Sequence, residues 1–133
     1  MTALTPGAAL EPLTYEITRA DLVAYAVASG DHNPIHQDEE IARAVGLPGV
    51  IAHGMYTLAL VGRAVAAWTD EAEVLELGAK FVAPVLVPAE GAARVTVAGT
   101  VGDRSDDGLL TLALEVTADG TKVLGAPKVT VRA

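Results

Sequence analysis

Residues 29–36 (SGDHNPIH) place an aspartate and a histidine five positions apart, and these two residue types together could do chemistry. Pro34 has no N–H and keeps Asn33 out of the helical region, so the segment cannot be helical throughout and is expected to form a rigid loop. A carboxylate beside an imidazole that titrates near neutral pH can move protons onto and off water. Asp31 and His36 are therefore the candidate catalytic residues.

The same letters also fit two surface turns, Gly-Asp and then Asn-Pro, with His36 as an exposed residue. Here the two turn signals are fused, apolar segments flank them, and a second His-Gly pair follows at His53 and Gly54. This combination favours the functional interpretation. A histidine just before a helix is more often a structural hydrogen-bonding residue, so His53 is assigned a supporting role, and His32 is expected to face solvent.

Bulk composition limits the class of protein. With 133 residues, a single domain over residues 1–133 is expected. The chain is 51% hydrophobic but only 4% aromatic, so branched aliphatic residues and alanine must build the core. A net charge of −8 argues against nucleic acid and anionic membrane surfaces as partners.

The chain has no cysteine, which excludes disulfides, thiolate nucleophiles and cysteine-based metal sites. Its three histidines lack convergent spacing, so no metal site is expected. Residues 1–13 contain no Lys or Arg and no apolar run of signal-peptide length, and the longest apolar stretch is too short to span a bilayer. A cytoplasmic location is the resulting expectation.

Local signals before the loop predict a short strand over residues 13–17 and then a helix. Thr18 followed by Asp21 resembles a capping box, and Gly30 predicts the end of the helix. The helix is therefore expected to deliver Asp31 at its exit.

After the loop, acidic residues 38–40 predict the start of a short helix that ends at Gly46. Residues 55–68 are apolar on nearly every face, which predicts an interior helix wrapped by other elements. Four segments rich in β-branched residues predict antiparallel strands, with a bend in the first near Gly78 and Pro84: residues 74–87, 92–101, 109–117 and 122–131. The fold class is α+β, with a sheet around one long apolar helix.

At this level of detail the chain resembles the hot-dog fold and, within it, the MaoC-like (R)-specific hydratases and dehydratases. The short length further resembles the catalytic subunit of heterodimeric (3R)-hydroxyacyl-ACP dehydratases. The resemblance runs from about Leu13 to the C-terminus. It is carried, in order, by Tyr25, Ser29, Gly30, Asp31, Asn33, Pro34, Ile35, His36, Ala42, His53, Gly54, Met55 and residues 81–88 (FVAPVLVP).

The resemblance implies a hydro-lyase that interconverts trans-2-enoyl and (3R)-3-hydroxyacyl thioesters of CoA or ACP, without a cofactor. Asp31 and His36 would hold the reacting water, and the Gly54 N–H at a helix start would bind the thioester carbonyl. Many relatives carry a small hydroxyl residue where this chain has Gly62. The supporting hydrogen bond is either absent here or supplied otherwise, with Thr57 as a candidate. The remaining loop residues would support the site: Ser29, Gly30, Asn33, Pro34 and His53.

Three other functions compete with this one. A hot-dog thioesterase would use a carboxylate near the long helix, but residues 54–68 contain no Asp or Glu. A non-catalytic subunit that only lines the acyl tunnel of a partner would need neither Asp31 nor His36. A small-molecule binding module without turnover would be inactive toward enoyl thioesters.

Assembly follows from the expected sheet. Four or five strands leave exposed edges, and one subunit supplies only one wall of an acyl pocket. A dimer with the pocket near the interface is therefore expected, a homodimer when the chain is alone, with a related hot-dog subunit as the alternative partner.

Overall fold

The computed structural model describes residues 4–132, which form one antiparallel sheet and a set of helices. The helices are α1 (Arg19–Ser29), the 3₁₀ helix η1 (Pro34–His36), α2 (Glu39–Ala44) and α3 (Gly54–Thr69). The strands are β1 (Ala9–Ile17), β2 (Glu73–Phe81), β3 (Ala93–Arg104), β4 (Leu109–Ala118), β5 (Thr121–Lys122) and β6 (Leu124–Arg132). The α+β class and the antiparallel sheet are confirmed.

The sheet has the order β1-β3-β4-β6-β2, and the short β5 pairs with β4. The edges are therefore β1 and β2, while the central strands pair on both sides. Asp119 and Gly120 both have positive φ (49° and 87°), as a two-residue hairpin turn requires, and this turn joins β4 to β5.

The prediction of one long strand over residues 74–87 is wrong in its second half, because β2 ends at Phe81. Its register shifts between Gly78 and Lys80, which confirms the expected irregularity. Pro84, which has no N–H, lies in the irregular stretch that follows. Beyond it the chain pairs with the segment before α3, where Ala52 N–H donates to Val85 O (2.9 Å) and Val87 N–H donates to Val50 O (3.0 Å).

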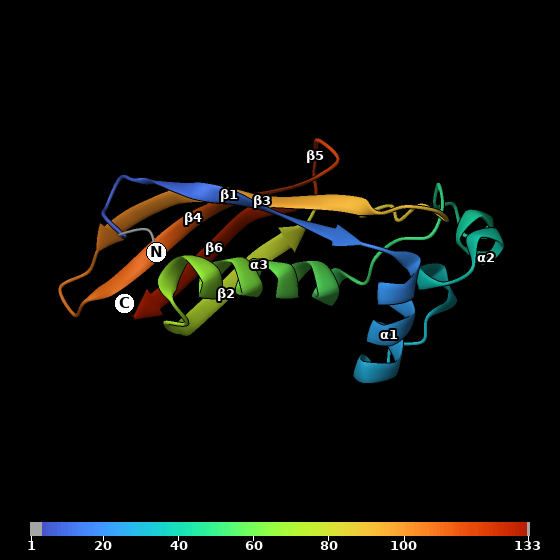
Figure 1. Cartoon of the computed structure of the whole chain (residues 1–133), viewed down its shortest axis with the longest axis horizontal. Coiled ribbons are helices and arrows are strands. Elements are labelled where there is room, and N and C mark those ends of the chain that lie inside the picture. Colours follow the sequence, from blue (N-terminus) through green and yellow to red (C-terminus); the bar gives the residue numbers. More distant parts are fainter. Residues whose placement is uncertain (1–3, 133) are drawn as a thin grey trace.

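Helix α3 lies across one face of the sheet, as Figure 1 shows, and is not enclosed on every side as its apolar sequence suggested. Its opposite side remains open, and Met55 there is 59% exposed. Arg63 also reaches the surface, where its guanidinium lies 4.7 Å from the Tyr15 ring centroid. The face toward the sheet contributes Thr57, Leu60, Val61, Ala64, Val65 and Trp68 to the interior.

The interior is built from aliphatic side chains of the sheet and α3, as the low aromatic content predicted. Its one tryptophan, Trp68, is buried and donates its indole N–H to Glu11 O (2.7 Å), which ties α3 to β1. Among the described residues, no helix has the length and apolarity needed to cross a membrane.

Gly62 lies inside α3, and a Cβ added there would meet nothing within 4 Å. We expect Gly62→Ala to raise the free energy of unfolding by about 0.5–1 kcal/mol, because alanine loses less backbone entropy in a helix than glycine does. Urea unfolding at fixed protein concentration measures the change.

Gly99→Ala is the matched control, because the same added methyl group would clash with the main-chain oxygen of Ala113 on the neighbouring strand. That variant should be strongly destabilised. Equal stability of the two variants would contradict the packing described for both glycines.

Candidate active site

The loop after α1 is held by its own polar side chains. Helix α1 begins with the expected capping box and ends at Gly30, whose φ of 79° lies in the left-handed region. Ser29 Oγ then accepts from Asp31 N–H, Asp31 Oδ1 from Asn33 N–H, and Asn33 Oδ1 from Ile35 N–H, each at 3.2 Å. These successive side-chain turns are the turns that the sequence predicted for this loop.

His36 ends this loop in η1 and is only 7% exposed, so the alternative of a surface histidine is wrong. Its Nδ1 lies 2.7 Å from Ile51 O. A carbonyl oxygen can only accept, so Nδ1 carries the hydrogen and Nε2 of the neutral ring is left with its lone pair. The geometry therefore presents Nε2 of His36 as a base.

His53 stacks on His36, with ring centroids 3.8 Å apart and ring planes 23° from parallel. Its Nε2 donates to Asp31 O (3.1 Å), and Tyr25 packs edge-on against it, with centroids 4.8 Å apart. The Nδ1 atom of His53 is buried and meets no hydrogen-bond partner within the described chain. His53 thus contacts both candidate catalytic residues. Its ring face stacks on His36, and its Nε2 donates to the main-chain carbonyl of Asp31.

Asp31, His36 and His53 each place one polar side-chain atom within 4.8 Å of the others. Two hydrogen bonds of about 2.8 Å to one water can span such a separation, so the spacing of Asp31 and His36 is compatible with a shared water. A shared metal ion fits less well. An imidazole binds a metal ion in the plane of its ring. Because the rings of His36 and His53 are stacked, their lone pairs lie in nearly parallel planes and do not converge on one ion.

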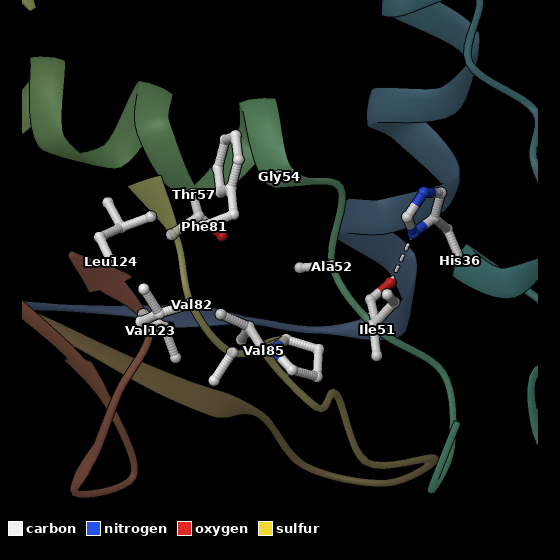
Figure 2. A pocket seen from close by; sticks show the side chains of 12 residues that line it. His36, Ile51, Ala52, Gly54, Thr57, Phe81, Val82, Val85, Val123 and Leu124 are labelled. Carbon is white, nitrogen blue, oxygen red and sulfur yellow. Dashed lines mark hydrogen bonds between the residues drawn. The ribbon is translucent and has the colours of Figure 1, made fainter. Parts of the chain in front are cut away.

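A cavity of about 320 Å³ opens beside His36. Figure 2 shows His36 at one end of it and Val123 and Leu124 at the other. Its walls come from the segment before α3, from the start of α3, from the end of β2 with the stretch after it, and from the start of β6. The lining residues are His36, Ile51, Ala52, Gly54, Thr57, Phe81, Val82, Ala83, Pro84, Val85, Val123 and Leu124.

Gly54 is the first residue of α3, so its N–H has no partner in the helix and lies where the helix dipole favours negative charge. His53, the N-cap, makes no side-chain capping bond. The Phe81 ring covers the glycine, since a Cβ at Gly54 would lie 3.1 Å from Phe81 Cε1. Phe81 itself is 56% exposed at the mouth of the cavity. The arrangement suits binding of a carbonyl oxygen beside an apolar chain.

An ion pair fixes α2 next to this loop. Arg19 donates to Val87 O and to the Glu39 carboxylate, both at 2.8 Å. The hydrogen bond from Arg19 lowers the pKa of Glu39 below its usual value. On α3, burial raises the pKa of Tyr56, whose ring packs against Tyr25 at 5.1 Å, so its hydroxyl stays protonated at neutral pH.

The structure brings Asp31, His36, His53 and Gly54 together from two separate segments, and it leaves His32 exposed as expected. Sequence reasoning missed Ile51, because the atom that holds His36 is a main-chain carbonyl and leaves no signal in residue type. It also missed residues 123–124, which line the cavity. They reach it because β6 pairs with β2, and residue types do not show which strands pair.

A family model described as "MaoC like domain" matches residues 2–118 of the chain. The 3-hydroxybutyryl-CoA dehydratase of Methylorubrum extorquens is 31% identical over 134 residues, covering 89% of this chain and 78% of that protein. The 3-hydroxyacyl-thioester dehydratase X of Mycobacterium tuberculosis is 44% identical over 73 residues, covering 55% of this chain. The chain spans only 25% of the length of that second relative.

Among solved structures, one described as a MaoC-like dehydratase superposes with a TM-score of 0.91 at 35% identity, covering 96% of this chain and 40% of that one. The (R)-hydratase from A. caviae involved in PHA biosynthesis superposes with a TM-score of 0.85 and covers 99% of this chain and 98% of its own. At 23% identity, that second likeness shows the fold.

The left-handed geometry at Gly30 yields a prediction for the loop. A Cβ at Gly30 would meet nothing within 4 Å, so only backbone strain opposes a side chain there. Gly30→Ala should lower the free energy of unfolding by about 1–2 kcal/mol in urea titrations. Gly30→Asn is the control, since asparagine tolerates this conformation, and it should lose less; the reverse order would contradict the assigned helix end.

Proposed function

Because the chain belongs to the MaoC-like domain family, we propose that it catalyses the reversible hydration of trans-2-enoyl thioesters to (3R)-3-hydroxyacyl thioesters. One observation carries the proposal: Asp31 and His36 lie within water-bridging distance of each other, and His36 lines an apolar cavity that also contains the start of α3. The cavity suits an acyl chain, and the α3 N-terminus suits its thioester carbonyl.

The chemistry needs two proton transfers and a place for negative charge. In dehydration, one of Asp31 and His36 removes the α proton, and the electron pair moves onto the carbonyl oxygen, where the Gly54 N–H stabilises the enolate. The carbonyl then re-forms, the β C–O bond breaks, and the other residue supplies the proton with which the hydroxyl leaves as water. Hydration is the reverse, and no redox change occurs.

The competing functions fit the geometry less well. A thioesterase needs a carboxylate aimed at the carbonyl, and α3 offers no Asp or Glu over residues 54–69. A purely structural subunit would not need a buried histidine whose tautomer is fixed by a main-chain carbonyl. The acyl carrier is CoA or ACP, and parallel assays with an acyl-CoA and an acyl-ACP substrate distinguish the two. A cytoplasmic location stays a prediction.

We also propose that the active unit is a dimer formed through the β2 edge. This edge strand exposes large apolar side chains, among them Val74 (42%), Leu75 (41%) and Phe81 (56%). An apolar strand edge without a partner favours pairing with another chain. Since Phe81 also lines the cavity, such pairing would place the acyl site near the subunit interface.

Replacing either catalytic residue tests the reaction. Asp31→Asn and His36→Ala should each lower the rate of trans-2-butenoyl-CoA hydration by roughly 10²–10⁴-fold, because each removes a proton-transfer group. Loss of the conjugated thioester absorbance follows the reaction. His32→Ala is the matched control, an exposed histidine beside Asp31, and should keep near-normal activity. Near-normal turnover by either catalytic variant would overturn the assignment.

Assembly is tested at the β2 edge. Leu75→Lys should shift sedimentation toward monomer and reduce hydration activity, because a charge on an edge strand opposes pairing. Val27→Lys introduces the same charge at a residue of α1 that is 73% exposed, away from β2, and should leave both properties unchanged. A monomeric wild-type chain with full activity would refute the dimer.

A further inference from the structure

Thr57 is a polar residue in an apolar place. It lies on α3 one turn after Gly54, is only 3% exposed, and lines the cavity. Figure 2 shows its hydroxyl oxygen beside Phe81, on the side of the helix that faces the cavity. Of the twelve residues that line this cavity, His36 and Thr57 alone have polar side chains.

The Thr57 hydroxyl makes no hydrogen bond within residues 4–132. A threonine inside a helix commonly donates to the carbonyl four residues earlier, and Thr69 of the same helix does so, with Oγ1 at 2.7 Å from Val65 O. Thr57 Oγ1 is not among the fully buried unpaired side-chain atoms of the described residues, so the oxygen is open to the cavity. The conformation of Thr57 therefore leaves a donor available inside the cavity.

The helix also sets where this donor lies relative to Gly54. Residues three apart share one face of an α-helix, and helical side chains lean toward the N-terminus. The Thr57 hydroxyl thus lies on the same side of α3 as the unpartnered N–H of Gly54. A ligand carbonyl oxygen at the start of α3 can accept from both.

We infer that Thr57 is a substrate-binding residue whose hydroxyl donates a second hydrogen bond to the thioester carbonyl oxygen, beside the Gly54 N–H. The inference rests on the proposed function and extends it. The second donor stabilises the charge that develops on this oxygen when the α proton leaves. It acts more strongly on the enolate than on the ground-state carbonyl, so it favours turnover over binding.

Thr57→Val removes the hydroxyl and keeps the branched shape. Its kcat for trans-2-butenoyl-CoA hydration should fall roughly 10²-fold, the usual effect of losing one such donor, with a smaller change in KM. Thr57→Ser keeps the hydroxyl and should recover most of the activity. A valine variant with wild-type kcat, beside an inactive Asp31→Asn variant, would overturn the role of Thr57 and leave the proposed reaction intact.

Stability separates a role in binding from a role in packing. If the hydroxyl serves the substrate, Thr57→Val should unfold at about the same urea concentration as the wild type, because the hydroxyl bonds to no other described residue. A destabilised valine variant would assign Thr57 to the fold and overturn the inference.

The carbonyl itself reports the contact. Asp31→Asn serves as a slow-turnover background in which trans-2-butenoyl-CoA, isotopically labelled at the carbonyl carbon, can be observed by infrared difference spectroscopy. The carbonyl stretch should lie at lower frequency in Asp31→Asn than in the double variant that adds Thr57→Val, because each hydrogen bond weakens the C=O bond. Equal frequencies would overturn the assignment, even if kcat had fallen.

Discussion

The hydrogen bond from His36 Nδ1 to Ile51 O, 2.7 Å long, is the constraint on which the site depends. It joins the loop after α1 to the segment before α3, and it decides which nitrogen of His36 carries the hydrogen. Without this hydrogen bond, the imidazole ring of His36 could rotate and present either Nδ1 or Nε2 to the site. With it, the stacked His53 links the His36 ring to the main chain of Asp31, so the two candidate catalytic residues belong to one connected unit.

The rest of the fold holds the two ends of that hydrogen bond in place. On one side, the capped α1 stops at Gly30 and releases a loop whose turns are closed by Ser29, Asp31 and Asn33. On the other side, Val50 and Ala52 are pinned by backbone bonds to residues 85 and 87. The long α3 then packs on the sheet through its buried face, so its N-terminus stays beside the histidines.

Much of this was readable from residue types, because the decisive signals are local. The capping pair Thr18 and Asp21, the stop at Gly30 and the Asn33-Pro34 turn each act within a few residues and predicted the observed geometry. The extent of β2 and the open side of α3 could not be read in this way. They depend on which strand pairs beyond Phe81 and on which helix face meets the sheet, and these are properties of the assembled fold.

The far end of the cavity is formed by residues outside the loop that carries Asp31 and His36. Val82 follows β2, and Val123 and Leu124 lie where β6 begins, so this wall and the Asp31–His36 unit belong to different stretches of chain. Mutations that enlarge or fill the wall need not disturb the two imidazoles. The cavity wall and the Asp31–His36 unit can therefore change independently, so the size of ligand that the cavity admits is separable from the arrangement of the two imidazoles.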